Sequence, residues 1–80
     1  MKFEFSRHAL EQMEARHISR ELVKQILAKP EQTVEGDGYK VYQTLMPGRK
    51  FLIRIFINDK TKVITVYKTS KIKKYYEGKI

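Results

Sequence analysis

Cysteine is absent from this chain of 80 residues, which excludes a disulfide framework, a thiolate nucleophile and the common cysteine-rich zinc sites. Only two histidines are present, too few for a self-sufficient metal site without carboxylates beside them. No run approaches the ~20 apolar residues that a membrane span requires, and the start of the chain lacks the apolar segment of a signal peptide. We therefore expect a soluble, cytoplasmic protein that uses neither metal nor cofactor.

Acidic residues are scarce in the second half of the chain. The first 35 residues carry six cations and six anions, whereas residues 36–80 carry eleven cations against three acids, so the whole net charge of +8 lies there. Lysine also serves solubility by protecting edge strands, but binding of a phosphate backbone favours such a one-sided field. Before residue 70 the only acids of this half are Asp37 and Asp59, both in predicted turns, so a two-metal nuclease has no ligands there.

Two amphipathic helices are predicted near the start. Within residues 6–16 apolar side chains recur three and four positions apart, and Ser6 can cap the free amides. A second helix follows Ser19 and ends before Pro30. Its apolar stripe consists of Leu22, Val23, Ile26 and Leu27. Because only about two residues lie between the helices, we predict that His17 adopts the left-handed conformation as a C-terminal cap rather than acting in catalysis.

After Pro30 the apolar pattern changes to a period of two. Strands are predicted at residues 32–35, 39–45, 50–58 and 62–69, separated by turns of the sequences GDG, MPGR and NDKT. Short connections join antiparallel neighbours. The expected fold is therefore α+β, with two N-terminal helices packed on a four-stranded antiparallel sheet in a single domain of residues 1–80. Residues 70–77 form either a short C-terminal helix or a tail.

A motif in the first helix resembles the signature of a family of short uncharacterised prokaryotic proteins. Residues 5–19 read FSRHALEQMEARHIS, against a family pattern of roughly Ser-x-His-Ala-x-x-Arg-Met-x-x-Arg-Gly-Ile-Ser/Thr. Residues 26–31 (ILAKPE) and 65–67 (TVY) agree in order and spacing. The sequence departs from the pattern at Gln12, where arginine is usual, and at His17, where glycine is usual. That family in turn resembles the RelE/ParE-like toxin superfamily.

The resemblance implies a toxin-like, RNA-directed protein, either a metal-independent endoribonuclease or an inactive descendant that kept the fold. Metal-free cleavage needs a group that accepts the 2′-hydroxyl proton, a group that protonates the leaving oxygen, and cations for the phosphorus centre. We select His8, Arg54, Arg16 and Tyr67 as the catalytic candidates. His8 can transfer protons in either direction near pH ~6.5; alternatively it supports the start of the helix.

Arg54 is the polar exception in an otherwise apolar central strand, residues 51–57 (FLIRIFI). Because burying an unpaired guanidinium is costly, it must face a carboxylate, solvent or a ligand anion. If it lies opposite the face that Thr65 and Tyr67 share, the group forms a polar strip suited to phosphate; otherwise it forms a salt bridge to an N-terminal glutamate. The strand register cannot be read from the sequence. Arg16 can alternatively bridge helix and sheet, and Tyr67 can fill the edge of the core.

The C-terminal end combines lysines with tyrosines. Lysines attract phosphate, and tyrosine rings offer surfaces on which bases stack; the alternative is a solvated tail. The nucleic-acid-binding candidates are Lys68, Lys71, Lys73, Lys74 and Tyr75, with Tyr76 and Lys79 nearby.

Two other function classes remain open. The same basic surface serves a non-catalytic nucleic-acid binding module, or an interaction protein that binds an acidic partner. The expected partners are accordingly RNA or the ribosome, an acidic antitoxin, or a second copy of the chain, because a core of this size buries only roughly 60–65% of the unfolded surface and gains from association.

Overall fold

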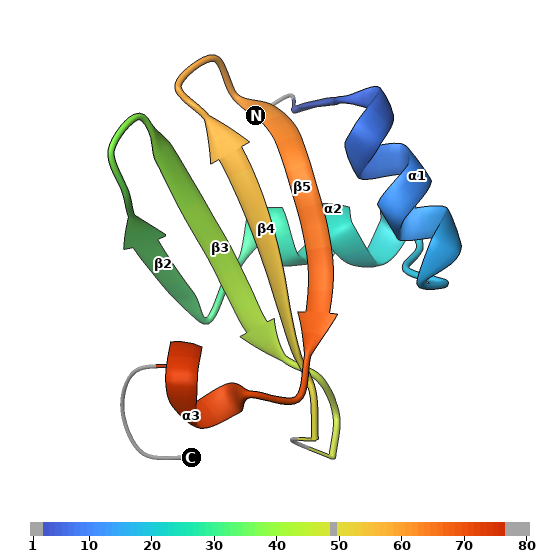
Figure 1. Cartoon of the computed structure of the whole chain (residues 1–80), viewed down its shortest axis with the longest axis vertical. Helices are drawn as coiled ribbons and strands as arrows, with labels where there is room; N and C mark the ends of the chain where they lie inside the picture. Colours follow the sequence, from blue (N-terminus) through green and yellow to red (C-terminus); the bar gives the residue numbers. More distant parts are fainter. Residues whose placement is uncertain (1–2, 49, 77–80) are drawn as a thin grey trace.

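The computed structural model describes residues 3–48 and 50–76, which form an α+β structure with a five-stranded mixed sheet and three helices (Figure 1). In chain order the elements are β1 (Glu4–Phe5), α1 (Arg7–Ala15), α2 (Arg20–Ala28), β2 (Gln32–Glu35), β3 (Tyr39–Leu45), β4 (Leu52–Asn58), β5 (Lys62–Thr69) and α3 (Ile72–Tyr75). The α+β class and the boundaries of both N-terminal helices agree with the prediction to within about a residue, and α3 supplies the short C-terminal helix.

The predicted four-stranded antiparallel sheet differs from the observed sheet in one strand. The order is β1-β5-β4-β3-β2, in which β2 to β5 pair antiparallel as expected and β1 adds a short parallel pairing to β5. β1 has only two residues, paired as Glu4 with Lys62 and Phe5 with Val63. A strand of two residues is too short to show periodicity in the sequence. Its partner strand also lies almost sixty residues away, so no local pattern indicates the pairing.

Serine side chains start both N-terminal helices, as predicted. Ser6 Oγ accepts a hydrogen bond from the Ala9 amide at 3.0 Å, and Ser19 Oγ accepts one from the Leu22 amide at 3.1 Å. The Ser6 hydroxyl also donates to the Ile64 carbonyl of β5 at 3.3 Å. Each cap satisfies an amide that the helix itself leaves free, and the Ser6 cap also ties the start of α1 to the sheet.

His17 lies in the left-handed region, with φ of 56°, as the position between the helices requires. Its amide donates to the Glu14 carbonyl at 3.2 Å, and the Ile18 amide donates to the Met13 carbonyl at 2.8 Å. This pair of bonds is the Schellman motif, which ends α1 and returns Ile18 to the core beside Met13. The predicted role of His17 as a cap is therefore confirmed.

We expect His17→Gly to keep or slightly raise the free energy of unfolding, because glycine adopts a positive φ without steric cost. His17→Val is expected to lower it by roughly 1–2 kcal/mol, because a left-handed β-branched residue is strained. Urea unfolding followed by circular dichroism measures both variants. Equal losses for glycine and valine would show that the imidazole, and not the backbone conformation, stabilises this junction.

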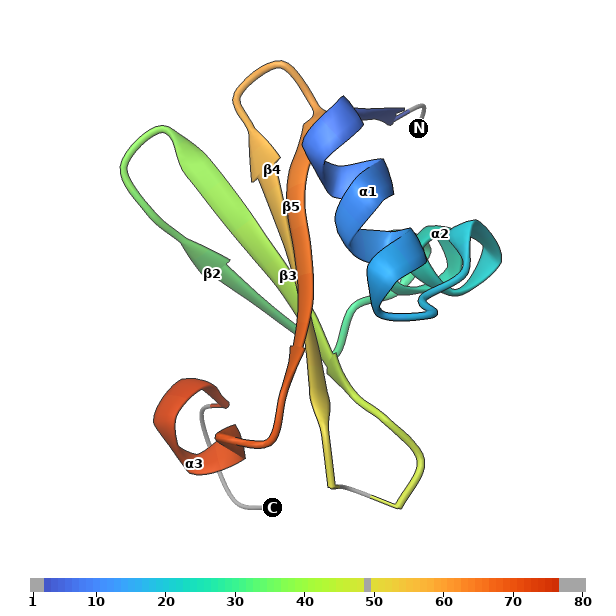
Figure 2. The same ribbon diagram turned by 45° about the vertical axis from the view of Figure 1, so that its right-hand side comes forward.

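The hydrophobic core lies between one face of the sheet and the pair α1 and α2. Figure 2 shows these helices on one side of the sheet and α3 on the other. Alternate residues of β4, namely Ile53, Ile55 and Ile57, point into the core. From β5 both Val63 and Val66 are fully buried there, although they are three residues apart. A β-bulge reconciles them: the register shifts between Phe56 and Ile57, which places one extra residue in β5.

Within the residues that the structure describes, no helix is long and apolar enough to cross a membrane.

Candidate functional site

Arg54 lies on the face of the sheet opposite α1 and α2, at the middle of the central strand β4. Its direct neighbours across the sheet are Gln43 of β3 and Tyr67 of β5. Nε of Arg54 donates to Oε1 of Gln43 at 3.0 Å, and Nη1 donates to the hydroxyl oxygen of Tyr67 at 2.6 Å. Arg54 is only 9% exposed. The register that the sequence left open therefore places Arg54 on the same face as Tyr67.

Aromatic rings surround the guanidinium. The guanidinium carbon lies 4.2 Å from the ring centre of Tyr75, 5.3 Å from that of Phe56 and 5.8 Å from that of Tyr67. Cation–π attraction stabilises such a group by about 0.5–2 kcal/mol when the cation is partly desolvated. The rings hold the cation in place and leave its charge unneutralised. We call Arg54, Gln43, Tyr67 and Tyr75 the arginine centre.

No carboxylate pairs with Arg54 among the described residues. The ion pairs there are Arg7 with Glu11 at 3.7 Å and Lys40 with Glu35 at 3.7 Å, both between exposed side chains. All six glutamates of the first 35 residues are described, and none of them reaches Arg54. The predicted alternative of a salt bridge from Arg54 to an N-terminal glutamate is therefore wrong.

One edge of the guanidinium has no hydrogen-bond partner among the described residues. Every buried side-chain nitrogen or oxygen of the described residues has a hydrogen-bond partner. The hydrogen bonds from Arg54 to described residues use Nε and Nη1, and none of them uses Nη2. These two bonds engage two of the five N–H donors, so the guanidinium retains donors for one more acceptor, such as a phosphate oxygen.

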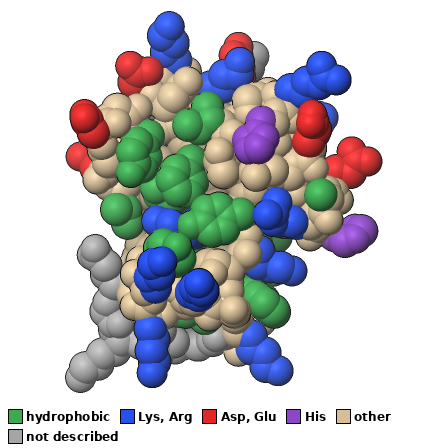
Figure 3. Space-filling view, viewed as in Figure 1, with side chains coloured by type: hydrophobic (Ala, Val, Ile, Leu, Met, Phe, Trp, Pro, Cys, Tyr) green, Lys and Arg blue, Asp and Glu red, His purple; other side chains and the backbone are tan. Residues whose placement is uncertain are grey.

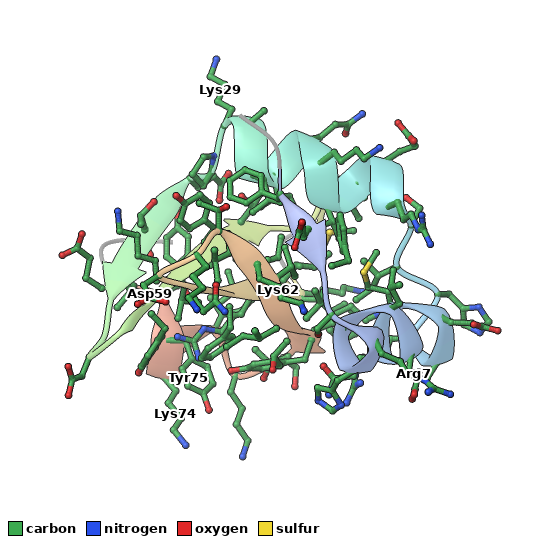
Figure 4. The ribbon with its side chains drawn as sticks, turned by 90° about the horizontal axis from the view of Figure 1, so that it is seen from above. Arg7, Lys29, Asp59, Lys62, Lys74 and Tyr75 are labelled. Carbon is green, nitrogen blue, oxygen red and sulfur yellow. The ribbon has the colours of Figure 1, made fainter. Side chains whose placement is uncertain are left out.

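The short helix α3 covers part of the arginine centre. Ile72 is buried, and the backbone carbonyl of Tyr75 accepts a hydrogen bond from Nε2 of Gln43 at 3.0 Å. The same nitrogen donates to Oε1 of Gln32 at 2.7 Å. Figure 4 shows Tyr75 and Lys74 on the side of the sheet away from α2. Gln43 is fully buried and links three segments, although sequence reasoning did not select it. Its signal was the alternation in β3, which places this polar residue on the same face as the buried Val41.

The pKa of the Tyr75 hydroxyl lies below its ordinary value. Desolvation by burial raises the pKa, but the charge of Lys74, hydrogen bonds from the side chains of Lys74 and Tyr67, and the charge of Arg54 together outweigh it. The cations that lower the pKa of Tyr75 would also favour a bound anion.

A row of four aromatic rings crosses this face of the sheet. Tyr39 and Phe56 stack with ring centres 5.7 Å apart, Phe56 and Tyr67 stack at 5.9 Å, and Tyr67 meets Tyr75 edge-on at 6.5 Å. We call these four residues the aromatic row. Figure 3 shows hydrophobic side chains gathered in a band on this face, with lysine and arginine side chains below it.

The two remaining catalytic candidates lie on another element. His8 and Arg16 belong to the outer surface of α1 and its C-terminal cap, where both side chains are exposed. Neither side chain has a hydrogen bond or an ion pair with a described residue. The structure thus brings Arg54 and Tyr67 together and keeps His8 and Arg16 out of contact with them. Arg16 does not form the predicted bridge from helix to sheet.

Gln12 has a structural role at the position where arginine is usual in the family pattern. Its Oε1 accepts a hydrogen bond from the Val66 amide at 3.2 Å. Beyond its pairing with β1, β5 is an edge strand, so this amide has no backbone partner. The side chain of Gln12 therefore protects the exposed edge of the sheet.

The predicted binding lysines occupy two places. Lys71, Lys73 and Lys74 are exposed in and beside α3, on the same face as the arginine centre. Lys68 pairs with Ile53 and so belongs to the opposite face, where its Nζ lies 4.9 Å from the ring centre of Phe51. Lys79 lies outside the described residues.

The sequence matches a known protein family. The sequence profile of the family described as "Domain of unknown function (DUF4258)" matches residues 5–73. The chain belongs to this family. No curated protein and no solved structure matches it. The matched stretch of the DUF4258 chain includes Gln43, Arg54 and Tyr67 of the arginine centre and ends before Tyr75.

A groove of the DUF4258 chain lies on the other face of the sheet. It has a volume of about 920 Å³ and lies between α2 and β1, lined in part by Phe3, Leu27 and Tyr42. The groove is lined by both cationic and anionic side chains, namely Lys24, Lys60 and Glu4, so its charge is mixed. Among the described residues no group of three histidine, aspartate or glutamate side chains could hold a metal ion. The arginine centre is therefore the site with the more distinct chemistry.

Proposed function

We propose that this DUF4258 chain is an RNA-directed protein of the RelE/ParE-like type, with Arg54 as its phosphate-binding residue. The observation that carries the proposal is a buried guanidinium that bonds to Gln43 and Tyr67 through Nε and Nη1 and pairs with no carboxylate of the described residues. Withdrawing a cation from water is costly unless an anion compensates for it. A phosphate at the free edge of Arg54 would supply that compensation.

The distribution of charge around Arg54 supports a polyanion over a single small anion. Lys71, Lys73 and Lys74 extend the positive charge from the arginine centre across α3. A phosphate backbone gains from each of these cations through release of counterions. The RelE/ParE-like part of the proposal rests on the resemblance in residues 5–19 and on two N-terminal helices placed against an antiparallel arrangement of β2 to β5.

The charge test compares two lysine positions that lie on different sides of the molecule. Figure 4 shows Lys74 beside Tyr75 and Lys29 at the far end of α2. For a fluorescein-labelled single-stranded RNA, we expect the logarithm of the binding constant to fall linearly with the logarithm of salt concentration. Lys74→Ala should reduce that slope by roughly 0.7, the value for one phosphate contact on a single strand, and Lys29→Ala should leave it unchanged.

Fluorescence anisotropy at several salt concentrations measures both slopes. Equal slopes for wild type and Lys74→Ala would contradict a phosphate contact at α3, and a wild-type chain that binds no RNA at any salt concentration would contradict the proposal itself. In the second case, capture of an acidic peptide would favour the interaction-protein alternative.

Metal-independent cleavage of RNA is the second candidate function. The cations next to the hydroxyl groups of Tyr67 and Tyr75 favour it. The Tyr67 hydroxyl accepts a short bond from Arg54, and the cations beside Tyr75 lower the pKa of that hydroxyl. Hydroxyls held next to cations can exchange protons with a 2′-hydroxyl or a leaving oxygen while the guanidinium stabilises the charge on phosphorus. His8 is not needed in this arrangement.

Cleavage should persist in EDTA, fall strongly in Tyr67→Phe and continue in His8→Ala. Denaturing gel electrophoresis of labelled RNA measures all three reactions. Loss of cleavage in His8→Ala with full activity in Tyr67→Phe would move the chemistry from the arginine centre to α1, and intact RNA throughout would leave a non-catalytic binding module.

A further inference from the structure

We propose that the aromatic row is a base-stacking surface and that the substrate class of this chain is unpaired RNA. The inference rests on the proposed function, because the same strand would place a phosphate at Arg54. It adds a second subsite, at the Tyr39 end of the row, that recognises the nucleobase and not the backbone.

The rings of the aromatic row are partly exposed to solvent and lie next to the guanidinium of Arg54. Tyr39 is 39% exposed, Phe56 and Tyr67 are half-buried, and α1 and α2 pack on the other face of the sheet. Arg54 lies within 6 Å of three of the four ring centres. A ligand that covers this surface must therefore combine flat apolar groups with negative charge at short spacing. A nucleic acid strand has this composition.

Tyr39 is positioned before any ligand binds. Its ring stacks on Phe56 and lies directly against the Cα atom of Gly36, where a Cβ atom would overlap the ring. Gly36 in turn closes the β2–β3 connection, since its amide donates to the Tyr39 carbonyl at 2.8 Å. Gly36 and Phe56 fix the orientation of the ring, so the 39% of Tyr39 that stays exposed can meet a base with little loss of conformational entropy.

The geometry favours unpaired strands over the other occupants. Bases in an A-form duplex are stacked on each other and cannot meet a flat protein face, whereas unpaired bases can be splayed onto aromatic side chains. A second copy of the chain would bring two positively charged faces together. An acidic peptide without aromatic side chains, such as polyglutamate, would satisfy the cations but has no rings to stack on the row.

The test uses two substitutions that leave the charge unchanged. Tyr39→Leu removes the terminal ring, and Gly36→Ala pushes that ring off the row at little cost to the fold, because only the far end of a side chain must move. Phe51→Leu is the matched control: Phe51 is equally exposed, at 41%, but contacts Lys68 on the opposite face. The probe is a fluorescein-labelled single-stranded RNA of about 12 nucleotides.

We expect Tyr39→Leu and Gly36→Ala each to weaken binding of the single strand about tenfold, the effect of losing one stacked base, with Phe51→Leu equal to wild type. A duplex of the same sequence should bind more weakly and respond to neither substitution. The inference is overturned if wild type binds the single strand and both variants bind it equally well, or if polyglutamate competes as effectively as RNA. Those results would leave the phosphate contact at Arg54 intact, whereas a wild type that binds no RNA would defeat the proposed function first.

Discussion

Replacing Arg54 by methionine is expected to weaken RNA binding by roughly 10- to 150-fold while the chain stays folded. The loss corresponds to one charge-assisted hydrogen bond to phosphate, about 1.5–3 kcal/mol. Stability should change by less than about 2 kcal/mol, because methionine fills similar space and removes a buried cation that no described carboxylate neutralises. The acceptors on Gln43 and Tyr67 lose their donor, which opposes this gain.

Arg54→Lys is the matched variant, since it keeps the charge and loses the planar fork that reaches Gln43 and Tyr67. We expect an affinity between those of wild type and Arg54→Met. Anisotropy titration gives the affinities and urea unfolding gives the stabilities. If Arg54→Met binds RNA as wild type does, Arg54 is a structural residue and the proposed phosphate site is wrong.

Truncation of Ile55 to alanine is expected to lower the free energy of unfolding by about 2–5 kcal/mol. Ile55 is fully buried at the middle of β4, between its strand neighbours Tyr42 and Val66 and beneath α1 and α2. The loss combines the transfer free energy of the deleted methyl groups with the cost of the cavity that they leave. Because a small domain is stable by only about 5–15 kcal/mol, this single change removes a large part of the total.

Ile64→Ala is the matched control for Ile55→Ala. Ile64 is half-buried beside the bulge in β5, so the same truncation there should cost less than half as much. The chain contains no tryptophan, so circular dichroism in urea is a suitable measure. Equal losses at the two positions would show that the core does not lie between the sheet and α1 and α2.

Arg54 could be selected from the sequence, but its partners could not. A cation among six apolar residues stands out because burial of an unpaired charge is costly. Whether Arg54 meets Tyr67 or a glutamate depends on strand register, and a shift of one residue moves every side chain to the other face. Gln43 was missed for the same reason, since its role as acceptor for Arg54 and donor to α3 exists only once β3 and β4 are aligned.

The bulge in β5 changes which side chains share a face. Strict alternation places Ile64, Val66 and Lys68 together, and the structure confirms this for Val66 and Lys68, which pair with Ile55 and Ile53. Before the bulge the alternation reverses, so Val63 joins Val66 in the core. No residue in β5 indicates the position of the bulge from the sequence alone, because a bulge arises from the fit between two strands.

Local chemistry determined from the sequence alone the two capped helices, the left-handed residue between them, the four longer strands and the one-sided charge. Each of these depends on neighbours a few positions away, through hydrogen-bond caps, side-chain periodicity or composition. Only the tertiary structure decided that Arg54 lies between Gln43 and Tyr67, that Tyr75 returns from α3 to cover it, and that His8 stays outside. The contacts of the arginine centre join residues 11 to 32 positions apart, and their geometry follows from register and packing, which no short stretch of sequence contains.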